Sequence, residues 1–115
     1  MIDFACRKFN LDEIIKCGLG LTKAELVIMN YFVKNPRVEF TSNEVSKELK
    51  LNLTTIQRAA KKLHEKKIIL RHQKNLGSGG YIYTYEASQK KEVREILKAI
   101  IKKWSYNVQN EIDNW

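Results

Sequence analysis

Several kinds of functional group are missing or scarce in this sequence. No stretch approaches the ~18 consecutive apolar residues that a membrane-spanning helix needs, and the N-terminus lacks the pattern of a signal peptide, so we expect a cytoplasmic protein. The two histidines, His64 and His72, stand apart from any cysteine or acidic cluster at metal-ligand spacing. No Ser-His-Asp, Cys-His or paired-carboxylate arrangement is visible. We therefore expect no metal site, no cofactor and no enzymatic activity.

Cysteine is scarce, with only Cys6 and Cys17 in 115 residues. If the segment between them is helical, their Cα atoms lie about 16 Å apart, which is too far for a disulfide within one chain. Reduced, packed thiols are the favoured interpretation. A redox role and an intersubunit disulfide stay open, because the same cysteine of two chains can meet at a two-fold axis.

Acidic residues are outnumbered, and the excess of positive charge is local. The formal net charge is +8 at pH 7. Residues 40–86 hold nine of the 21 Lys and Arg residues but only four of the 13 Asp and Glu residues. A lysine-rich solvated surface is the bland interpretation. We favour nucleic-acid binding, because the cations fall on a helix and a hairpin suited to contact a polyanion.

Residues 54–66 predict an amphipathic helix. Ile56, Ala60 and Leu63 recur at helical spacing and define one apolar stripe. At about 100° per residue, the opposite side is cationic and rich in hydrogen-bonding groups. Such a helix can pack on a domain with one side and read nucleic acid with the other. The opposite side comprises Thr54, Arg58, Lys61 and Glu65, flanked by Gln57 and Lys62.

A second short helix precedes this one. Thr41 and Glu44 form a capping-box pattern that opens a helix over 42–50. Residues 51–53 then make a turn, and Thr54 or its neighbour is the expected N-cap of the following helix. Two short helices with such a connection are typical of a helix-turn-helix.

A hairpin follows the two helices. The run 68–74 is typical of a strand, 75–80 is a glycine-rich turn, and 81–85 alternates aromatic with β-branched residues, as strands do. For Tyr81, Tyr83 and Tyr85 we favour packing within the strand over stacking on bases. Helix, turn, helix and hairpin together predict a winged helix.

Three segments resemble the MarR and TrmB-like winged helix-turn-helix transcription regulators of the small archaeal type. Residues 41–49 resemble the first helix of their helix-turn-helix, 53–63 their recognition helix, and 68–71 with 81–83 their wing. The resemblance implies an α+β fold, mainly α with a small β-hairpin, and flanking helices at both ends. Similar regulators dimerise through terminal helices and accommodate a small-molecule effector near them, although no residue here identifies such a ligand.

We expect a single domain over 1–115. An N-terminal helical extension occupies 1–21, the winged core 22–87, and a C-terminal dimerisation helix 88–115. The extension is read as one helix or two short ones up to about residue 18.

The first helix of the core is marked by the capping-box pair Thr22 and Glu25, and it ends near Lys34, before Asn35-Pro36. We expect the segment 38–40 to add a short third strand to the hairpin.

The C-terminal helix, which Ser88 is expected to cap, carries an apolar stripe longer than one small winged helix needs. Either it packs on the chain's own N-terminal helix or it packs on a second subunit. We favour a two-fold homodimer with half-sites about 34 Å apart. The predicted interface is Val93, Ile96, Leu97, Ile100, Ile101, Trp104, Val108 and Ile112.

Contacts to nucleic acid follow from these elements. Gln57 can pair bidentately with adenine and Arg58 with guanine, or Arg58 can hold a phosphate instead. The recognition-helix set is Thr54, Thr55, Gln57, Arg58, Lys61 and Lys62. The backbone and wing set is Ser42, Asn43, Lys66, Lys67, Arg71, Lys74, Gly77, Ser78 and Gly79.

The favoured function is that of a sequence-specific, double-stranded DNA-binding transcriptional regulator. It would act as a homodimer on a pseudo-palindromic operator, with the recognition helix in the major groove and the wing on the backbone or minor groove. The alternative is a winged-helix module for protein interaction or RNA binding, because fold alone does not fix function. The basic outer face of the 54–66 helix favours the first.

Overall fold

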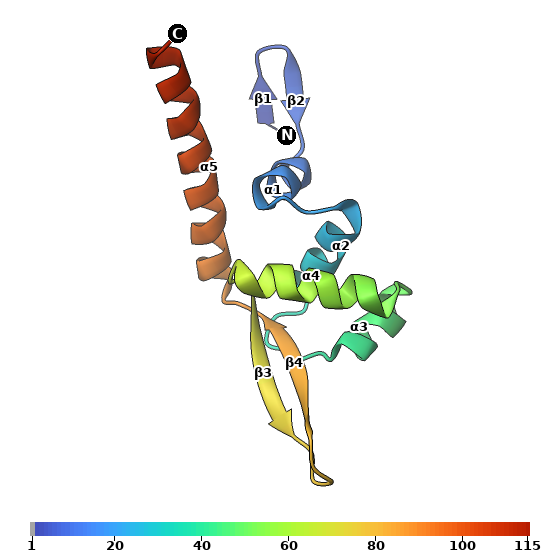
Figure 1. The fold of residues 1–115 in the computed structure, drawn as a ribbon. Helices are drawn as coiled ribbons and strands as arrows, with labels where there is room; N and C mark the ends of the chain where they lie inside the picture. Colours follow the sequence, from blue (N-terminus) through green and yellow to red (C-terminus); the bar gives the residue numbers. More distant parts are fainter. Residues whose placement is uncertain (1) are drawn as a thin grey trace.

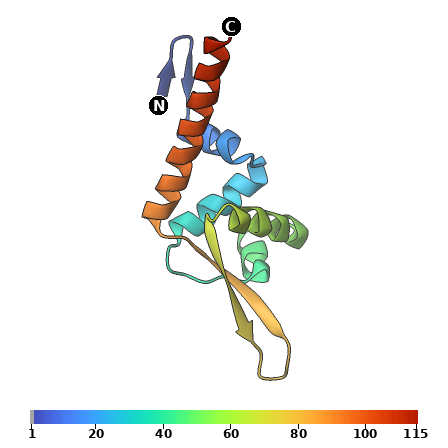
Figure 2. The ribbon, with the colours of Figure 1, turned by 60° about the vertical axis from the view of Figure 1, so that its left-hand side comes forward.

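Helices dominate the computed structural model, which describes residues 2–115. The molecule is elongated, 62 × 24 × 23 Å, with the wing hairpin at one end (Figure 1). At the other end an N-terminal hairpin lies beside the last turns of the C-terminal helix (Figure 2). This arrangement confirms the predicted α+β winged-helix fold. The elements are β1 (Ile2–Phe4), β2 (Arg7–Phe9), α1 (Leu11–Leu19), α2 (Lys23–Lys34), α3 (Ser42–Leu49), α4 (Leu53–Glu65), β3 (Ile69–Asn75), β4 (Tyr81–Ala87) and α5 (Lys90–Asp113).

Both predicted capping boxes are present at the starts of α2 and α3. The Thr22 hydroxyl accepts from the Glu25 amide (3.2 Å) while the Glu25 carboxylate accepts from the Thr22 amide (2.8 Å). Thr41 and Glu44 repeat the pattern, with both distances at 3.1 Å. Each box satisfies backbone donors that the first turn of a helix leaves free. Helices α2 and α3 therefore begin where the sequence predicts.

The recognition helix α4 begins one residue earlier than predicted. The side chain of Asn52 accepts from the Thr54 amide at 2.8 Å and makes Asn52 the N-cap. The prediction of Thr54 or its neighbour as the cap is therefore wrong. The physical reason is that an asparagine oxygen two residues before Thr54 reaches that amide directly, and asparagine is a stronger cap than threonine.

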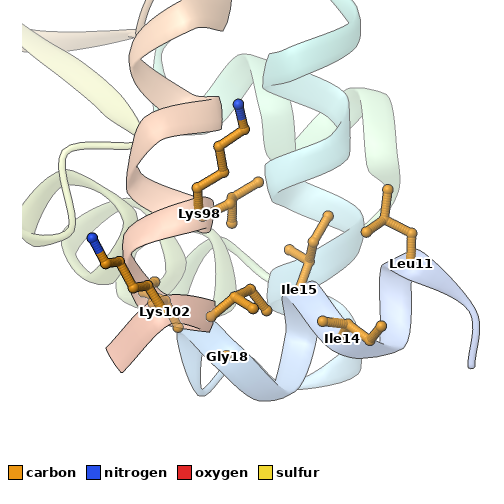
Figure 3. Close-up of a pocket in the computed structure, with 9 residues that line it drawn as sticks. Leu11, Ile14, Ile15, Gly18, Lys98 and Lys102 are labelled. Carbon is orange, nitrogen blue, oxygen red and sulfur yellow. The ribbon is translucent and has the colours of Figure 1, made fainter. Parts of the chain in front are cut away.

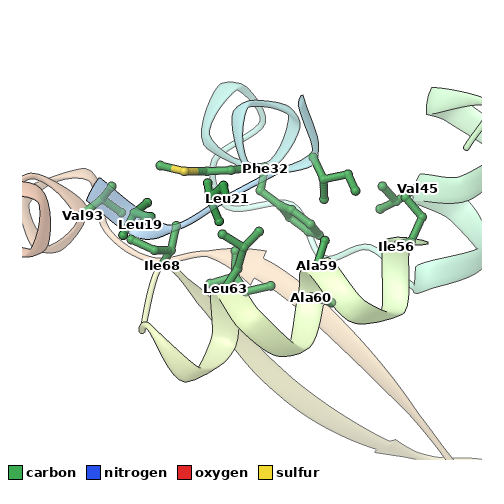
Figure 4. Packing of buried hydrophobic residues seen from close by; sticks show 13 residues of the cluster. Leu19, Leu21, Phe32, Val45, Ile56, Ala59, Ala60, Leu63, Ile68 and Val93 are labelled. Carbon is green, nitrogen blue, oxygen red and sulfur yellow. The ribbon is translucent and has the colours of Figure 1, made fainter. Parts of the chain in front are cut away.

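The five helices, α1 through α5, share one hydrophobic core with the base of the β3–β4 hairpin (Figure 4). The apolar stripe of α4 is fully buried in it, and Phe32 of α2 is its largest buried side chain. Burial of this stripe fixes which side of α4 is left for solvent. The buried set is Leu19, Leu21, Ile28, Met29, Phe32, Val45, Ile56, Ala59, Ala60, Leu63, Ile68, Ile69 and Val93.

The wing is a regular antiparallel hairpin that projects away from the helices (Figure 1). Its tip is turned by Gly79 and Gly80, whose φ angles of 93° and 78° favour glycine. The predicted third strand over 38–40 is wrong in extent. Only Phe40 bridges to β4, through two backbone hydrogen bonds of 2.8 Å with Tyr85.

The N-terminal segment differs most from the prediction. A helix over 1–18 is wrong for residues 2–9, which form the β1–β2 hairpin with Ile2 opposite Phe9. Its turn carries a positive φ at Ala5 (42°), and an alanine there gives no sequence signal for a turn. Residues 11–18 are helical as predicted, capped by Asn10, and the helix continues one residue further, to Leu19. Met1 lies outside the described residues, and the division at 21 and 87 stays a prediction.

The C-terminal helix α5 packs on α1 with its first half only. The close approach is set by Gly18, where an added Cβ would lie 3.2 Å from Cγ2 of Ile100. Ser88 does not cap α5, contrary to the prediction. Its buried hydroxyl donates to the Lys67 carbonyl (2.8 Å), and Gln89 takes the N-cap position without a side-chain hydrogen bond. The second half of α5 extends into solvent.

Candidate nucleic-acid interface

The solvent-facing side of α4 carries two exposed cations, Arg58 and Lys61. Thr54, Gln57, Arg58 and Lys61 are exposed, and Thr55 is half-buried beside them. In residues 2–115 none of their side chains is engaged in an ion pair or a side-chain hydrogen bond within the chain. These groups are therefore free to donate to, or accept from, a partner.

Helix α3 packs against α4 in the fold. Ser42 is half-buried and Asn43 exposed in its first turn. The amide of Thr41 is occupied by the Glu44 carboxylate, so an anion at this end would meet the amides of the first turn rather than the cap.

Lys62 departs from its predicted role. Its ammonium donates to the Gly20 carbonyl at 2.8 Å and to Oε1 of Glu25 at 2.9 Å, so it ties α4 to the α1–α2 corner. Burial alone would raise the pKa of Glu25, but the hydrogen bond from the Thr22 amide and the Lys62 pair outweigh it and hold that pKa below its ordinary value. The carboxylate is thus charged and compensated. The placement of Lys62 on the recognition face was wrong, because its ammonium is engaged by Glu25. The local sequence could not reveal this pair, since Glu25 lies 37 residues away.

The C-terminal end of α4 leads into the wing. Lys66 is half-buried at the C-cap position, and Lys67 is exposed with a φ of 65°. At the wing tip Gly77, Ser78 and Gly79 are all exposed. The predicted backbone-contacting residues between 66 and 79 therefore follow one stretch of chain from the end of α4 to the wing tip, whereas Ser42 and Asn43 lie on α3.

Lys74 is less available than the sequence suggested. Its ammonium lies 3.4 Å from Oε2 of Glu39, and Thr84 donates to the other oxygen of that carboxylate at 2.7 Å. The Thr84 hydrogen bond is the main cause that lowers the pKa of Glu39. On the same face Nε2 of His72 lies 2.7 Å from Oε1 of Glu86. The positive charge of Lys74, which was predicted to contact the DNA backbone, is therefore partly neutralised.

A tyrosine cluster on the wing was not predicted as functional. The guanidinium carbon of Arg71 lies 4.5 Å from the ring centroid of Tyr83, whose ring stands edge-on to Tyr81 with centroids 5.2 Å apart. The neighbouring Tyr83 phenol raises the pKa of Tyr81. Side chains alternate between the two faces along each strand, and the position of the turn sets the pairing of the strands. Together these sequence features could have predicted that the cluster lies on one face.

The predicted dimer residues divide into two groups along α5. Val93 is buried, and Ile96, Leu97 and Ile100 are half-buried against the chain's own hydrophobic core. The remaining four are exposed, which leaves an apolar surface without a partner in one copy of the chain. They are Ile101, Trp104, Val108 and Ile112.

A groove of about 370 Å³ runs between α1 and α5 (Figure 3). Its walls are apolar and include Leu11, Ile14 and Ile15, while Lys98 and Lys102 extend along its α5 side. The groove adjoins Ile101, so it continues the exposed apolar surface of α5.

Cysteine chemistry and metal binding can be checked over residues 2–115. Cys6 and Cys17 are free and exposed, so the prediction of packed thiols is wrong. Cys6 lies in the β1–β2 turn, where the sequence predicted a helix. The described chain has no group of three or more His, Cys, Asp or Glu side chains able to hold a metal ion. Within the same residues, none of the helices has the length and apolar character to span a membrane.

Known proteins resemble this chain along nearly its whole length. A possible transcriptional regulator from Methanosarcina mazei is 43% identical over 100% of this chain and 96% of its own, with a TM-score of 0.93. A Methanocaldococcus jannaschii protein is 25% identical over 94% of this chain and 80% of its own. A mutant of S. aureus MepR bound to an oligodeoxyribonucleotide shares the fold, with a TM-score of 0.52 and 14% identity over 94% of this chain and 86% of its own.

The family-level match refines the resemblance drawn from the sequence. The likeness to MarR and TrmB-like regulators is confirmed as far as the winged-helix fold. The model of the DnaD N-terminal domain matches residues 9–111, which include every element from α1 to the last turns of α5. The chain therefore belongs to the DnaD N-terminal domain family.

Proposed function

We propose that this protein is a winged-helix regulator of transcription that binds double-stranded DNA through α4. The observation that carries the proposal is the exposed side of α4, where Gln57, Arg58 and Lys61 face solvent and have no carboxylate partner within residues 2–115. The M. mazei relative, described as a possible transcriptional regulator, and the oligonucleotide bound to the S. aureus MepR mutant support it.

Roles of the α4 side chains follow from base chemistry. In the major groove Gln57 pairs with the N6 and N7 positions of adenine, and Arg58 pairs with O6 and N7 of guanine. Thr54 and Thr55 supply a hydroxyl or a methyl group for thymine. Lys61, one turn further along the exposed side, reaches a phosphate and orients the helix.

The flanking elements hold the backbone. Free amides in the first turn of α3, at Ser42 and Asn43, suit a phosphate oxygen. Lys66 and Lys67 approach the backbone between α4 and the wing. Lys62 is left out of the proposed contacts, because its ammonium is engaged by Gly20 and Glu25.

We infer a homodimer built through the exposed half of α5. An apolar face that includes Trp104, Val108 and Ile112 fits a second copy of the same face, as a two-fold axis requires. Two copies would present α4 to half-sites about 34 Å apart on a pseudo-palindromic operator. A small-molecule effector stays a prediction.

The DNA-binding proposal is tested by fluorescence anisotropy of a labelled mixed-sequence duplex at 50 and 200 mM salt. Phosphate-driven binding should weaken at least about 100-fold between the two conditions. No binding at 50 mM would refute the proposal and favour a protein-interaction module. Lys103→Ala removes an exposed lysine of α5 that is not among the proposed DNA contacts; it is the charge-matched control for variants of the α4 cations and should bind as wild type.

Base reading by α4 is tested with an operator selected from random duplexes. Arg58→Ala should lose about 1–3 kcal/mol on that operator if Arg58 contacts a base. Its affinity for unrelated duplex should change less. Equal affinity of wild type and Arg58→Ala for the operator would remove Arg58 from the reading surface.

The dimer is tested by sedimentation velocity. Trp104→Glu places a charge on a side chain that is 63% exposed, so the fold should survive while the association fails. A wild-type protein that sediments as a monomer would refute the proposed interface.

A further inference from the structure

The wing hairpin has two chemically different faces. In an antiparallel pair, opposite residues point to the same side of the sheet, and successive residues of a strand point to opposite sides. The observed register therefore sorts the wing residues into two sets. One face carries Arg71, Gln73, Asn75, Tyr81 and Tyr83, and the other carries His72, Lys74, Ile82, Thr84 and Glu86.

The second face already satisfies its own charges. Glu39, from the segment beside β4, accepts from Thr84 at 2.7 Å and pairs with Lys74 at 3.4 Å. His72 pairs with Glu86 at 2.7 Å. A polyanion that approached this face would meet two carboxylates and would have to displace Glu39 to use Lys74. This face is therefore poorly suited to a phosphate backbone.

The first face has a cation and no carboxylate. Arg71 lies over the Tyr83 ring at 4.5 Å, an arrangement that orients the guanidinium without neutralising it. Tyr81 is 55% exposed, and its ring stands edge-on to Tyr83. Gln73 and Asn75 are exposed on the same side. All five side chains can donate a hydrogen bond.

The first face also lies on the helix side of the hairpin. Nearer its base the same face carries Ile69, Tyr85 and Ala87, which pack against the helical core that includes α4. Because the alternation continues along both strands, Arg71 and Tyr83 point to the side on which the helices lie. A duplex that lies against α4 would therefore reach this face first.

We propose that the wing binds the sugar-phosphate backbone of duplex DNA through Arg71, Tyr81 and Tyr83, and not through Lys74. This inference rests on the proposed DNA-binding function. Arg71 donates charge-assisted hydrogen bonds to a phosphate, and the Tyr81 hydroxyl donates to a phosphate oxygen. Tyr83 acts as a positioning residue, because its ring holds the guanidinium in place. Such contacts orient the protein on the duplex and carry no sequence information.

The test compares two neighbouring cations of β3 that point to opposite faces. Arg71→Ala and Lys74→Ala each remove one positive charge, so their net charges are matched. Anisotropy titrations use a mixed-sequence duplex and the selected operator. We expect Arg71→Ala to weaken both by about tenfold and to reduce the magnitude of the salt slope by about one. Lys74→Ala should change affinity less than about twofold.

A second pair of variants separates positioning from folding. Tyr83→Phe keeps the ring under Arg71 and should bind nearly as wild type. Tyr83→Ala removes the ring and should approach the loss seen for Arg71→Ala. Arg71→Lys should retain the salt slope, because it keeps a charge at the same position. Thermal unfolding of each variant shows whether a loss of binding comes from a loss of fold.

The outcomes separate the two proposals. If wild type binds duplex DNA and Lys74→Ala loses as much affinity as Arg71→Ala, the assignment of the Arg71 face as the DNA-binding face is overturned, and the proposed DNA binding stands. If Arg71→Ala weakens only the operator, Arg71 reads bases and the backbone assignment is overturned. If wild type binds single-stranded DNA more tightly than duplex DNA and Tyr81→Ala loses this preference, the backbone assignment is overturned in favour of stacking of Tyr81 on bases. If wild type does not bind duplex at 50 mM salt, the proposed function fails and this inference fails with it.

Discussion

The link between Lys62 and the α1–α2 corner makes opposite predictions for two adjacent lysines of α4. Lys62→Met removes a hydrogen bond to the Gly20 carbonyl (2.8 Å) and an ion pair with Glu25 (2.9 Å). Lys61→Met removes an exposed charge with no partner in residues 2–115. The first variant should lose stability, and the second should lose affinity for DNA.

The expected magnitude follows from the burial of the pair. A hydrogen bond from a charged donor contributes about 1.5–3 kcal/mol, whereas an exposed ion pair contributes about 0–1 kcal/mol. The Lys62 side chain is 35% exposed and that of Glu25 11%, so solvent screens the lysine but scarcely the carboxylate left behind. We therefore expect Lys62→Met to destabilise the fold by about 2 kcal/mol. An unfolding entropy of about 2.1 cal/mol/K per residue converts this to a fall in Tm of about 8 °C.

The assay is thermal unfolding followed by circular dichroism, with a double-mutant cycle to Glu25→Gln. Coupling between the two positions should be about 1 kcal/mol, because they share one contact. Lys61→Met should change the free energy of unfolding by less than about 0.5 kcal/mol, and it should reduce the salt slope of DNA binding by about one. The reasoning is refuted if Lys62→Met unfolds no earlier than Lys61→Met, or if the two variants reduce the salt slope equally.

Three further predictions concern stability. The pKa of Glu25 is lower in the fold than its ordinary value of 4.5, so the ionised carboxylate contributes fully to stability above pH 4.5, and this contribution is lost as pH falls through the pKa of the folded state. The difference in Tm between wild type and Glu25→Gln should therefore shrink below pH 4.5. A difference that stays constant down to about pH 3 would contradict this. Gly18→Val puts a branched side chain against Ile100 and should destabilise by about 1–3 kcal/mol; an unchanged Tm would show that α1 and α5 separate freely. Ser88→Ala leaves the Lys67 carbonyl without its donor and should cost about 1 kcal/mol in chemical unfolding, and a cost under a few tenths would mean that water replaces the hydroxyl.

The parts of the fold that the sequence predicted depend on short-range signals. A capping box lies within four residues, so Thr22 and Thr41 mark their helices without tertiary information. The stripe of Ile56, Ala60 and Leu63 is likewise local, and it correctly separates the buried and exposed sides of α4. Helix periodicity carries such information because side chains three and four residues apart share a face.

The parts that were missed depend on distant partners or on an unusual turn. Lys62 belongs to Glu25, 37 residues earlier, and Lys74 to Glu39, 35 residues earlier, so the charge pattern of α4 and the wing could not reveal either pair. The β1–β2 hairpin turns at Ala5 with a positive φ, where the sequence has none of the usual glycine or asparagine.

The position of the aromatic chromophores has a spectroscopic consequence. The chain has two tryptophans, both exposed: Trp104 lies in the second half of α5 and Trp115 follows the end of that helix, so neither belongs to α4 or the wing. Their emission therefore senses the environment of one pole of a molecule 62 Å long. A shift in that emission when duplex is added would report a change at α5, outside the proposed DNA contacts, either within one chain or at the inferred dimer interface.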